Sequence, residues 1–232
     1  MKEKVVFNWS GGKDSMLALH KVLEEDRLEV VALLTTLNEK YDRISMHGVR
    51  AKLLEQQAER LGIPLRKILL PEMADMETYT RIMGEETTFW KAQGITAFLF
   101  GDLFLEDIRA YREKQLTGSG IRPEFPIWQY GTRKAAHDFI HLGYKAILTS
   151  VDASKLNETF AGRHFDEKLL SDFPEDTDLC GENGEFHSFV FDGPLFSKPV
   201  QFKKGKTIHK TYQLQDKNVS SGFYFTDLEP IE

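Results

Sequence analysis

Apolar and polar positions alternate regularly through the first hundred residues. Four apolar runs have the length of buried strands, at residues 4–9, 30–34, 65–70 and 96–100. Between them, apolar residues recur at helical spacing in residues 16–23, 49–61 and 76–93. Gly62 and Gly94 follow two of these segments, and glycine is typical just past the end of a helix. Strands joined by helices pair in parallel, so the pattern predicts a doubly wound parallel α/β sheet with helices on both faces.

The pattern changes in the second half of the chain. A helix is expected over residues 106–116, and Gly118-Ser119-Gly120 after it is the most linker-like tripeptide. We therefore predict two domains, residues 1–119 and residues 120–232, the second being smaller and of mixed α/β type. A helix over 133–142 and a strand over 145–151 leave open whether the first sheet continues beyond this boundary. Alternation over 207–212, after turn residues 204–206, predicts an antiparallel hairpin.

Composition and charge narrow the functional classes. Hydrophobic residues make up 41% and charged residues 28%, which is ordinary for a globular protein. The net charge is -6 and the longest basic run is Lys203-Lys204 with Lys206, so general nucleic-acid binding is not indicated, although a local RNA-binding patch stays open. No apolar stretch has membrane-spanning length, and we expect a cytoplasmic protein without a membrane partner. Cys180 is the only cysteine, which excludes a disulfide within the chain and a thiol pair.

The segment between the first strand and the first helix has the character of an anion site. It consists of Ser10, Gly11, Gly12, Lys13, Asp14 and Ser15. Backbone amides at a helix start are unpaired and favour an anion, and two glycines allow the backbone to close around phosphate oxygens. The spacing matches neither Walker A nor the dinucleotide fingerprint. The alternative is a plain turn in which Ser10 caps the helix.

This segment resembles the PP-loop of the ATP pyrophosphatases, which cleave ATP between the α and β phosphates. The resemblance implies that residues 10–15 bind ATP, with Lys13 neutralising phosphate charge and Ser10 and Ser15 donating hydrogen bonds. It also implies that Asp14 orients the loop or helps to place Mg²⁺. Which other carboxylates would bind the metal is left open.

A second cluster of polar residues lies at residues 178–187. It contains Asp178, Glu182 and Glu185, together with two glycines and His187. Glycines at this spacing let acidic side chains converge on one cation or amine. The alternative is a solvated acidic turn.

Three segments together resemble the diphthine–ammonia ligase family: SGGKDS at 10–15, Gly101-Asp102, and GENGEFHSFVFDGPLF at 181–196. The resemblance extends over nearly the whole chain. It implies a Rossmann-like (HUP-type) sheet, a carboxyl-terminal substrate domain, ATP with Mg²⁺, and ammonia as the nucleophile. The characterised family substrate is a modified histidine of translation elongation factor two. One departure is Asn183, where the best-known members carry glycine.

The resemblance implies amidation of a carboxylate acceptor by way of an adenylate. Lys13 would stabilise charge at the α phosphorus, and Glu182 or Glu185 would bind ammonium and take its proton. Asp102 follows a strand expected beside the first one, where a doubly wound sheet binds ligands, so we assign it a catalytic or metal-binding role, with a helix N-cap as the alternative.

Two further residues are candidates for contacts with the nucleotide or the acceptor. His47 follows the second strand, although a loop histidine is more often an ordinary surface residue. Arg109 shares a helix face with Arg112 and could grip a carboxylate or phosphate, but ion pairs with Asp107 and Glu113 explain the pair as well.

Two other functions remain open at this point. PP-loop synthetases act on other acceptors, including small molecules and tRNA, and some relatives of this fold bind a nucleotide without turnover. Glu182 and Glu185 favour an amidating enzyme over a sensor, because a sensor has no need of them. The oligomeric state, a homo-oligomer included, is not decided by the sequence.

Overall fold

The computed structural model describes residues 2–44, 48–72, 74–213 and 220–231. Its elements in chain order are β1 (Glu3–Asn8), α1 (Lys13–Glu25), β2 (Leu28–Asn38), α2 (Ala51–Leu61), β3 (Leu65–Leu70), α3 (Met76–Ala92), β4 (Ala97–Leu99), α4 (Glu106–Leu116), β5 (Arg122–Glu124), α5 (Thr132–His141), β6 (Lys145–Asp152), the short 3₁₀ helix η1 (Glu158–Phe160), α6 (Glu167–Asp172), β7 (Phe186–Asp192), β8 (Phe202–Gln213) and β9 (Ser220–Pro230).

The first sheet contains five parallel strands in the order β3-β2-β1-β4-β5. The doubly wound parallel sheet predicted from the sequence is thus confirmed, and β4 lies beside β1 as expected. The chain winds outward from β1 to β3 on one side and then returns to β4 on the other. This reversal creates a switch point at the carboxyl ends of β1 and β4, where the loops that follow the two strands meet.

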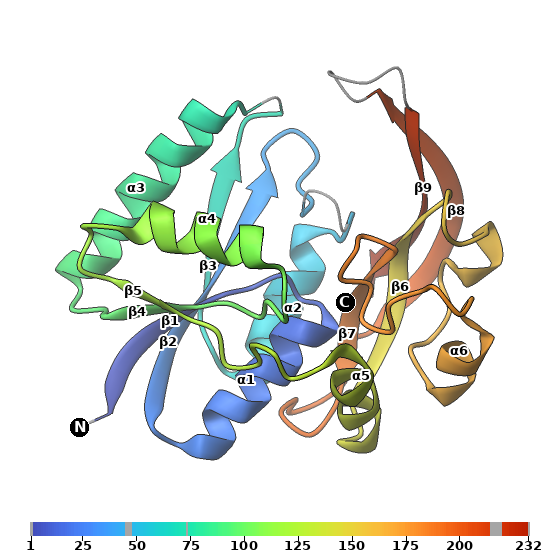
Figure 1. Ribbon diagram of the computed structural model, residues 1–232, viewed down its shortest axis with the longest axis horizontal. Helices are drawn as coiled ribbons and strands as arrows, with labels where there is room; N and C mark the ends of the chain where they lie inside the picture. Colours follow the sequence, from blue (N-terminus) through green and yellow to red (C-terminus); the bar gives the residue numbers. More distant parts are fainter. Residues whose placement is uncertain (1, 45–47, 73, 214–219, 232) are drawn as a thin grey trace.

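Helices cover both faces of this sheet (Figure 1). Adjacent residues of β1 show why, because Val6 and Phe7 are both fully buried and belong to different core clusters. Phe7 shares its cluster with apolar residues of α1, α2 and α5, whereas Val6 shares its cluster with residues of α3 and α4. A strand buried on both faces has a continuous apolar sequence instead of an alternating one. Within the described ranges, no helix is both long and apolar enough to cross a bilayer.

The second sheet is antiparallel, with the strand order β7-β6-β9-β8. The predicted carboxyl-terminal hairpin is confirmed as β8 and β9. Residues 204–206, which the sequence suggested as the turn before it, instead lie inside β8. There the pairing with β9 shifts register between Lys204 and Thr207, so Gly205 marks a bulge.

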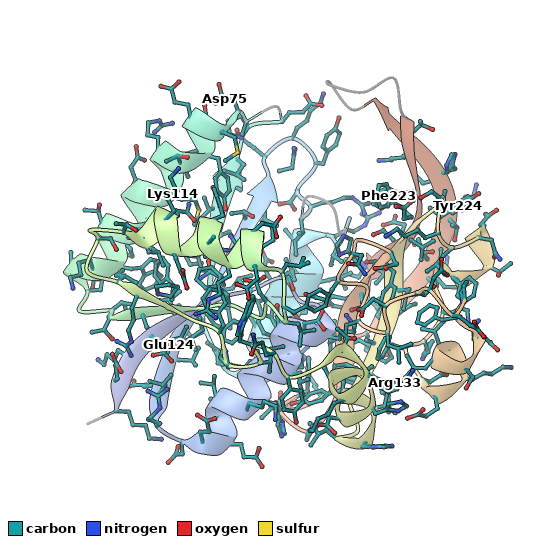
Figure 2. The ribbon with its side chains drawn as sticks, viewed as in Figure 1. Asp75, Lys114, Glu124, Arg133, Phe223 and Tyr224 are labelled. Carbon is teal, nitrogen blue, oxygen red and sulfur yellow. The ribbon has the colours of Figure 1, made fainter. Side chains whose placement is uncertain are left out.

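The two sheets are joined by apolar packing around helix α1. Helix α1 contacts both α5 and β7, and one core cluster extends from Phe7 to Phe189 of the second sheet. Figure 2 shows Glu124 on β5 of the first sheet, and Phe223 and Tyr224 on β9 of the second sheet. Because β5 pairs with β4 in the first sheet, that sheet extends past residue 119, and we propose that the domain division lies between β5 and α5.

Candidate functional site

The phosphate loop, residues 10–15, is fixed by contacts from distant parts of the chain. Gly11 has a φ of 75°, and a Cβ there would lie 2.6 Å from Leu54 Cδ2, so the position requires glycine. Its carbonyl accepts hydrogen bonds from Val190 N at 3.0 Å and from Gln57 Nε2 at 3.1 Å. The Gln57 side chain is fully buried and accepts a further bond from Trp9 Nε1 at 2.6 Å. The loop conformation is therefore set by the fold.

Serine hydroxyls line the inside of this loop. Ser10 Oγ and Ser15 Oγ are 2.7 Å apart, and Gly12 N donates to Ser10 Oγ at 3.2 Å. Gly12 occupies the N-cap position of α1, so the alternative in which Ser10 caps the helix is wrong. A glycine cap has no side chain of its own to satisfy the first amides of the helix. Lys13 N donates to Ser188 Oγ at 3.2 Å, and the amides that follow it in the first turn are suited to an anion.

Lys13 provides a buried, fixed positive charge. Its side chain is only 4% exposed, and Nζ donates to Asp14 Oδ2 at 2.7 Å and to the Cys180 carbonyl. Nζ also lies 5.1 Å from the centre of the Phe186 ring. Burial by itself lowers the pKa of Lys13, but the charge and hydrogen bond of Asp14 outweigh that effect and raise the pKa above its ordinary value. The ammonium therefore stays charged.

Gly101 and Asp102 follow β4 and face the phosphate loop. A Cβ on Gly101 would lie 2.9 Å from Ser15 N, so only glycine permits this close approach. Burial raises the pKa of Asp102, and the charge of Asp14 adds to the increase, while Arg112, whose Nε is 3.8 Å from Asp102 Oδ2, opposes it. Leu105 is the N-cap of α4, so the helix-cap alternative for Asp102 is wrong.

The acidic loop, residues 178–187, is folded around Asp178. The Asp178 carboxylate oxygen Oδ1 accepts from Cys180 N at 2.8 Å and from Glu182 N at 3.2 Å. Glu182 faces the same cavity as Lys13 and Asp14. Burial and the charge of Asp14 raise the pKa of Glu182 to about 8, against the opposing effect of Lys13. A carboxyl group with such a pKa can exchange a proton near neutral pH.

Glu185 is placed differently from Glu182. It is 2% exposed and lies outside the residues that line the cavity. Its Oε1 accepts from Asn183 Nδ2 at 3.2 Å and from Asp178 N at 3.4 Å, and Lys155 Nζ lies 3.6 Å away. These contacts fix Oε1 within the loop and beside Lys155, while the other carboxylate oxygen, Oε2, is buried without a hydrogen-bond partner among the described residues.

One cavity of about 610 Å³ brings these segments together at the carboxyl edge of the first sheet. The phosphate loop, Gly101-Asp102 and the acidic loop form its polar part. Apolar side chains form another part of its wall, namely Leu34, Ile44, Tyr79, Met83, Leu105 and Ile108. A volume of this size, with a few polar groups in a largely apolar wall, is typical of a small-molecule site.

Two family models cover most of the chain. The diphthamide synthase N-terminal domain matches residues 2–123, and the diphthamide synthase C-terminal domain matches residues 131–219. The chain belongs to the diphthamide synthase family. The gap between the two matches falls where the first sheet ends and α5 begins.

Individual relatives agree with this family. The chain is 24% identical over 216 residues to a diphthine–ammonia ligase of Mus musculus, with 82% of this chain and 79% of the relative covered. The same values hold for a diphthine–ammonia ligase of Rattus norvegicus. Among solved structures, a predicted tRNA methyltransferase subunit from Methanocaldococcus jannaschii is similar at a TM-score of 0.45 and 18% identity, covering 85% of this chain and all of the other. A tRNA thiolase from Methanococcus maripaludis reaches 0.39 at 18% identity, covering 61% and 57%.

Two predicted residues of this diphthamide synthase family member remain, His47 and Arg109. His47 is outside the described residues. Arg109 does not line the cavity; its guanidinium lies 4.8 Å from the Trp128 ring centre, and Nε donates to Glu113 at 2.8 Å. Arg112, one turn further along α4, is the arginine that reaches the cavity.

Ser188 and His187 are polar cavity residues that were not among the predicted site residues. Ser188 Oγ accepts from Lys13 N at 3.2 Å and so joins β7, just after the acidic loop, to the phosphate loop. His187 also lines the cavity, and burial, with the nearby charge of Lys13, lowers its pKa to about 4. Both follow Glu185 directly in the run that carries the family resemblance, which was the available signal.

Proposed function

We propose that this protein is an ATP-dependent ligase that amidates a carboxylate with ammonia and releases AMP and pyrophosphate. The observation that carries the proposal is the meeting of the phosphate loop, Asp102 and Glu182 on one cavity at the switch point of a parallel sheet. The names of the curated relatives, diphthine–ammonia ligase, support both the reaction class and diphthine as the acceptor.

The cavity has the features that ATP requires. Gly11 has a left-handed conformation and Gly101 approaches Ser15 N closely, so the two glycines set the shape of the phosphate loop and its contact with β4, and Lys13 supplies a positive charge. The apolar wall that includes Leu34, Tyr79 and Met83 suits a planar base. Asp14 and Asp102 offer the carboxylate oxygens that Mg²⁺ prefers, and the ion would neutralise phosphate charge.

The proposed chemistry has two steps. An oxygen of the acceptor carboxylate attacks the α phosphorus, the bond to the oxygen that bridges the α and β phosphates breaks, and pyrophosphate leaves with that oxygen. Ammonia then attacks the acyl carbon of the adenylate, and AMP leaves with the former carboxylate oxygen. Lys13 stabilises the negative charge that develops during the first step.

Glu182 is suited to the second step. Ammonium must lose a proton before its nitrogen can attack, and a carboxylate beside the reaction site can bind the cation and accept that proton. With a pKa of about 8, Glu182 is a stronger base than an ordinary carboxylate once it is ionised. Glu185 acts through the shape of the acidic loop and not by contact with the reactants.

A product analysis tests the proposed function. The purified protein is incubated with ATP, Mg²⁺ and ammonium, and with a diphthine-bearing protein, small carboxylic acids or tRNA as separate acceptors. We expect AMP and pyrophosphate in equal amounts, only with a carboxylate acceptor, and amide formation that depends on ammonium. Orthophosphate and ADP as products would contradict cleavage between the α and β phosphates. AMP formation only with tRNA would contradict the assigned acceptor.

A further inference from the structure

Three side chains that could bind a metal ion lie close together on the surface, away from the cavity at the carboxyl edge of the first sheet. They are His137 and His141 on α5 and Glu167 on α6, and their ligand atoms all lie within 4.8 Å of one another. His137 Nδ1 is 3.0 Å from Glu167 Oε1, and His141 Nε2 is 3.6 Å from the same oxygen. None of the three lines the cavity described above.

The fold holds these side chains on rigid elements. Residues four apart on a helix share one face, so both imidazoles of α5 project from the same side. Ala136 and Phe139, on another side of α5, are buried and fix the orientation of the helix. Asp166 caps α6 by accepting from Leu169 N at 2.8 Å, and Leu169 is fully buried, which fixes Glu167 in the first turn. In Figure 1, α5 and α6 lie close together on the side of the second sheet.

We propose that His137, His141 and Glu167 bind one divalent transition-metal ion, with Zn²⁺ as the best match. Two imidazole nitrogens and one carboxylate oxygen are a donor set used by zinc, whereas Mg²⁺ and Ca²⁺ take oxygen ligands. Zinc bonds of about 2.1 Å in a tetrahedron place neighbouring ligand atoms about 3.4 Å apart. The two nitrogen–oxygen separations, 3.0 and 3.6 Å, lie on either side of that value.

Exposure of the cluster agrees with a site that is open to solvent. The side chain of Glu167 is 51% exposed and that of His141 is 69% exposed, so an ion can enter and water can take the fourth position. The competing explanation is that His137 and His141 both form ion pairs with Glu167. Such ion pairs need protonated imidazoles, whereas metal binding needs neutral ones.

The ion would join α5 to α6, and the segments that begin these two helices contact Cys180 and Lys13 of the cavity wall. Thr132 at the start of α5 accepts a hydrogen bond from the Cys180 thiol, and the Cys180 carbonyl accepts from Lys13. Phe165, two residues before Glu167, has its ring centre 5.8 Å from Lys13 Nζ. Joining α5 to α6 therefore stabilises the folded state, because an ion that binds the folded chain shifts the unfolding equilibrium.

The test uses the untagged full chain, freed of metal with a chelator that is then removed. Co²⁺ is titrated as a spectroscopic probe and Zn²⁺ by calorimetry and thermal melting. We expect one ion per chain, visible absorption typical of tetrahedral Co²⁺, and a higher Tm with Zn²⁺. His141→Ala and Glu167→Gln should each weaken binding at least about tenfold, since loss even of an outer-shell partner costs that much. Both lie on the surface and leave the core untouched.

His164→Ala is the matched control, because His164 is an exposed histidine outside the cluster. It should bind Co²⁺ and Zn²⁺ as the unchanged chain does. Absence of binding to the unchanged chain would overturn the proposal. So would equal binding by His141→Ala, Glu167→Gln and the unchanged chain, since the ion would then lie elsewhere. Neither result depends on ligase activity, so this site and the proposed function fail separately.

Discussion

The phosphate loop and the acidic loop line the same cavity but are held in different ways. The phosphate loop is fixed from outside, by Gln57 and Val190 binding the Gly11 carbonyl. The acidic loop is held mainly by its own short-range bonds, as from Asp178 to the amide of Glu182. In the first loop, Gly11 and Lys13 are both held by bonds to distant parts of the chain. In the second loop, Glu182 and Glu185 are three residues apart, but only Glu182 lines the cavity, while Glu185 is buried outside its lining.

Because the two loops are held differently, substitutions in them should affect different properties, either turnover or stability. Changes in the phosphate loop should remove function, because in the proposed reaction its groups would face the phosphates of ATP. Changes in the acidic loop should separate into those that remove chemistry, at Glu182, and those that loosen the loop, at Glu185 and Asn183. Substitutions at Lys13, Glu182, Glu185 and Asn183 can distinguish these two kinds of effect.

Lys13→Met should lower the rate of pyrophosphate release by roughly 10³-fold, the upper range for loss of one preorganised charge-stabilising group. The matched control is Lys21→Met on the same helix, whose ammonium lies 4.2 Å from the Tyr130 ring centre and not in the cavity. Steady-state assays of both variants, with thermal melts to establish folding, make the measurement. Equal losses in the two variants would show that the position in the cavity is irrelevant.

Glu182→Gln should lower turnover about 100-fold, the range for loss of a general base, while ATP binding measured by calorimetry is kept. In the unchanged protein kcat/KM should rise with pH through about 8 as Glu182 ionises, and this inflection should vanish in the variant. Glu185→Gln should instead lower the free energy of unfolding by about 1–3 kcal/mol. The reverse pattern would contradict the different positions of the two carboxylates.

The raised pKa of Glu182 also predicts a change in stability. Its pKa in the folded chain, about 8, exceeds the ordinary value of 4.5, so the folded state holds the proton more tightly than the unfolded state. The resulting stabilisation is complete below pH 4.5 and is lost as pH rises toward and through 8. Above pH 8, Glu182→Gln should therefore have a higher Tm than the unchanged protein. Melting curves across this range check it, and an equal or lower Tm would contradict the burial of a charge at this position.

Arg112→Leu should lower kcat/KM about tenfold, and Arg109→Leu should change it much less. Only Arg112 lines the cavity, with its Nε 3.8 Å from Asp102, whereas Arg109 contacts Trp128 and Glu113 outside it. A tenfold loss corresponds to about 1.4 kcal/mol of transition-state stabilisation. Steady-state kinetics of the two variants, measured in parallel, test this. A greater loss of kcat/KM in Arg109→Leu would support Arg109, the residue predicted from the sequence, as the substrate contact.

Asn183→Gly should have the smallest effect. It removes the hydrogen bond from Asn183 Nδ2 to Glu185 Oε1, worth about 1 kcal/mol, without touching a cavity group. Denaturant unfolding measures the loss, and turnover should stay close to that of the unchanged protein. A large loss of turnover with unchanged stability would give Asn183 a direct role in the reaction.

Local patterns predicted much of the fold. Strand β3 and helix α4 have the bounds expected from the sequence. In β3, Ile68 and Leu70 are buried at alternate positions, which leaves a local apolar pattern. Strand β5 was not predicted, since its three residues, Arg122 to Glu124, form no apolar run and include a proline. Residues 204–206 were misread as a turn because a strand bulge and a turn favour the same residue types.

The site could be predicted only as far as its motifs. The phosphate loop was recognisable because its groups are contiguous in sequence and lie between a strand and a helix. Glu182 and Glu185 looked equivalent, because the side to which each points is set by Gly181, with a φ of 70°, and by packing against Phe186. Arg109 and Arg112 share a helix face, and only the tertiary packing on Trp128 and Phe100 distinguishes them.

In the proposed reaction the acceptor carboxylate attacks the α phosphorus of ATP. The decisive measurement places oxygen-18 in that carboxylate and analyses the products of one ammonium-dependent turnover by mass spectrometry. We expect one labelled oxygen in the phosphate of AMP and none in pyrophosphate. Label in orthophosphate, as from an acyl phosphate formed at the γ phosphorus, would contradict it.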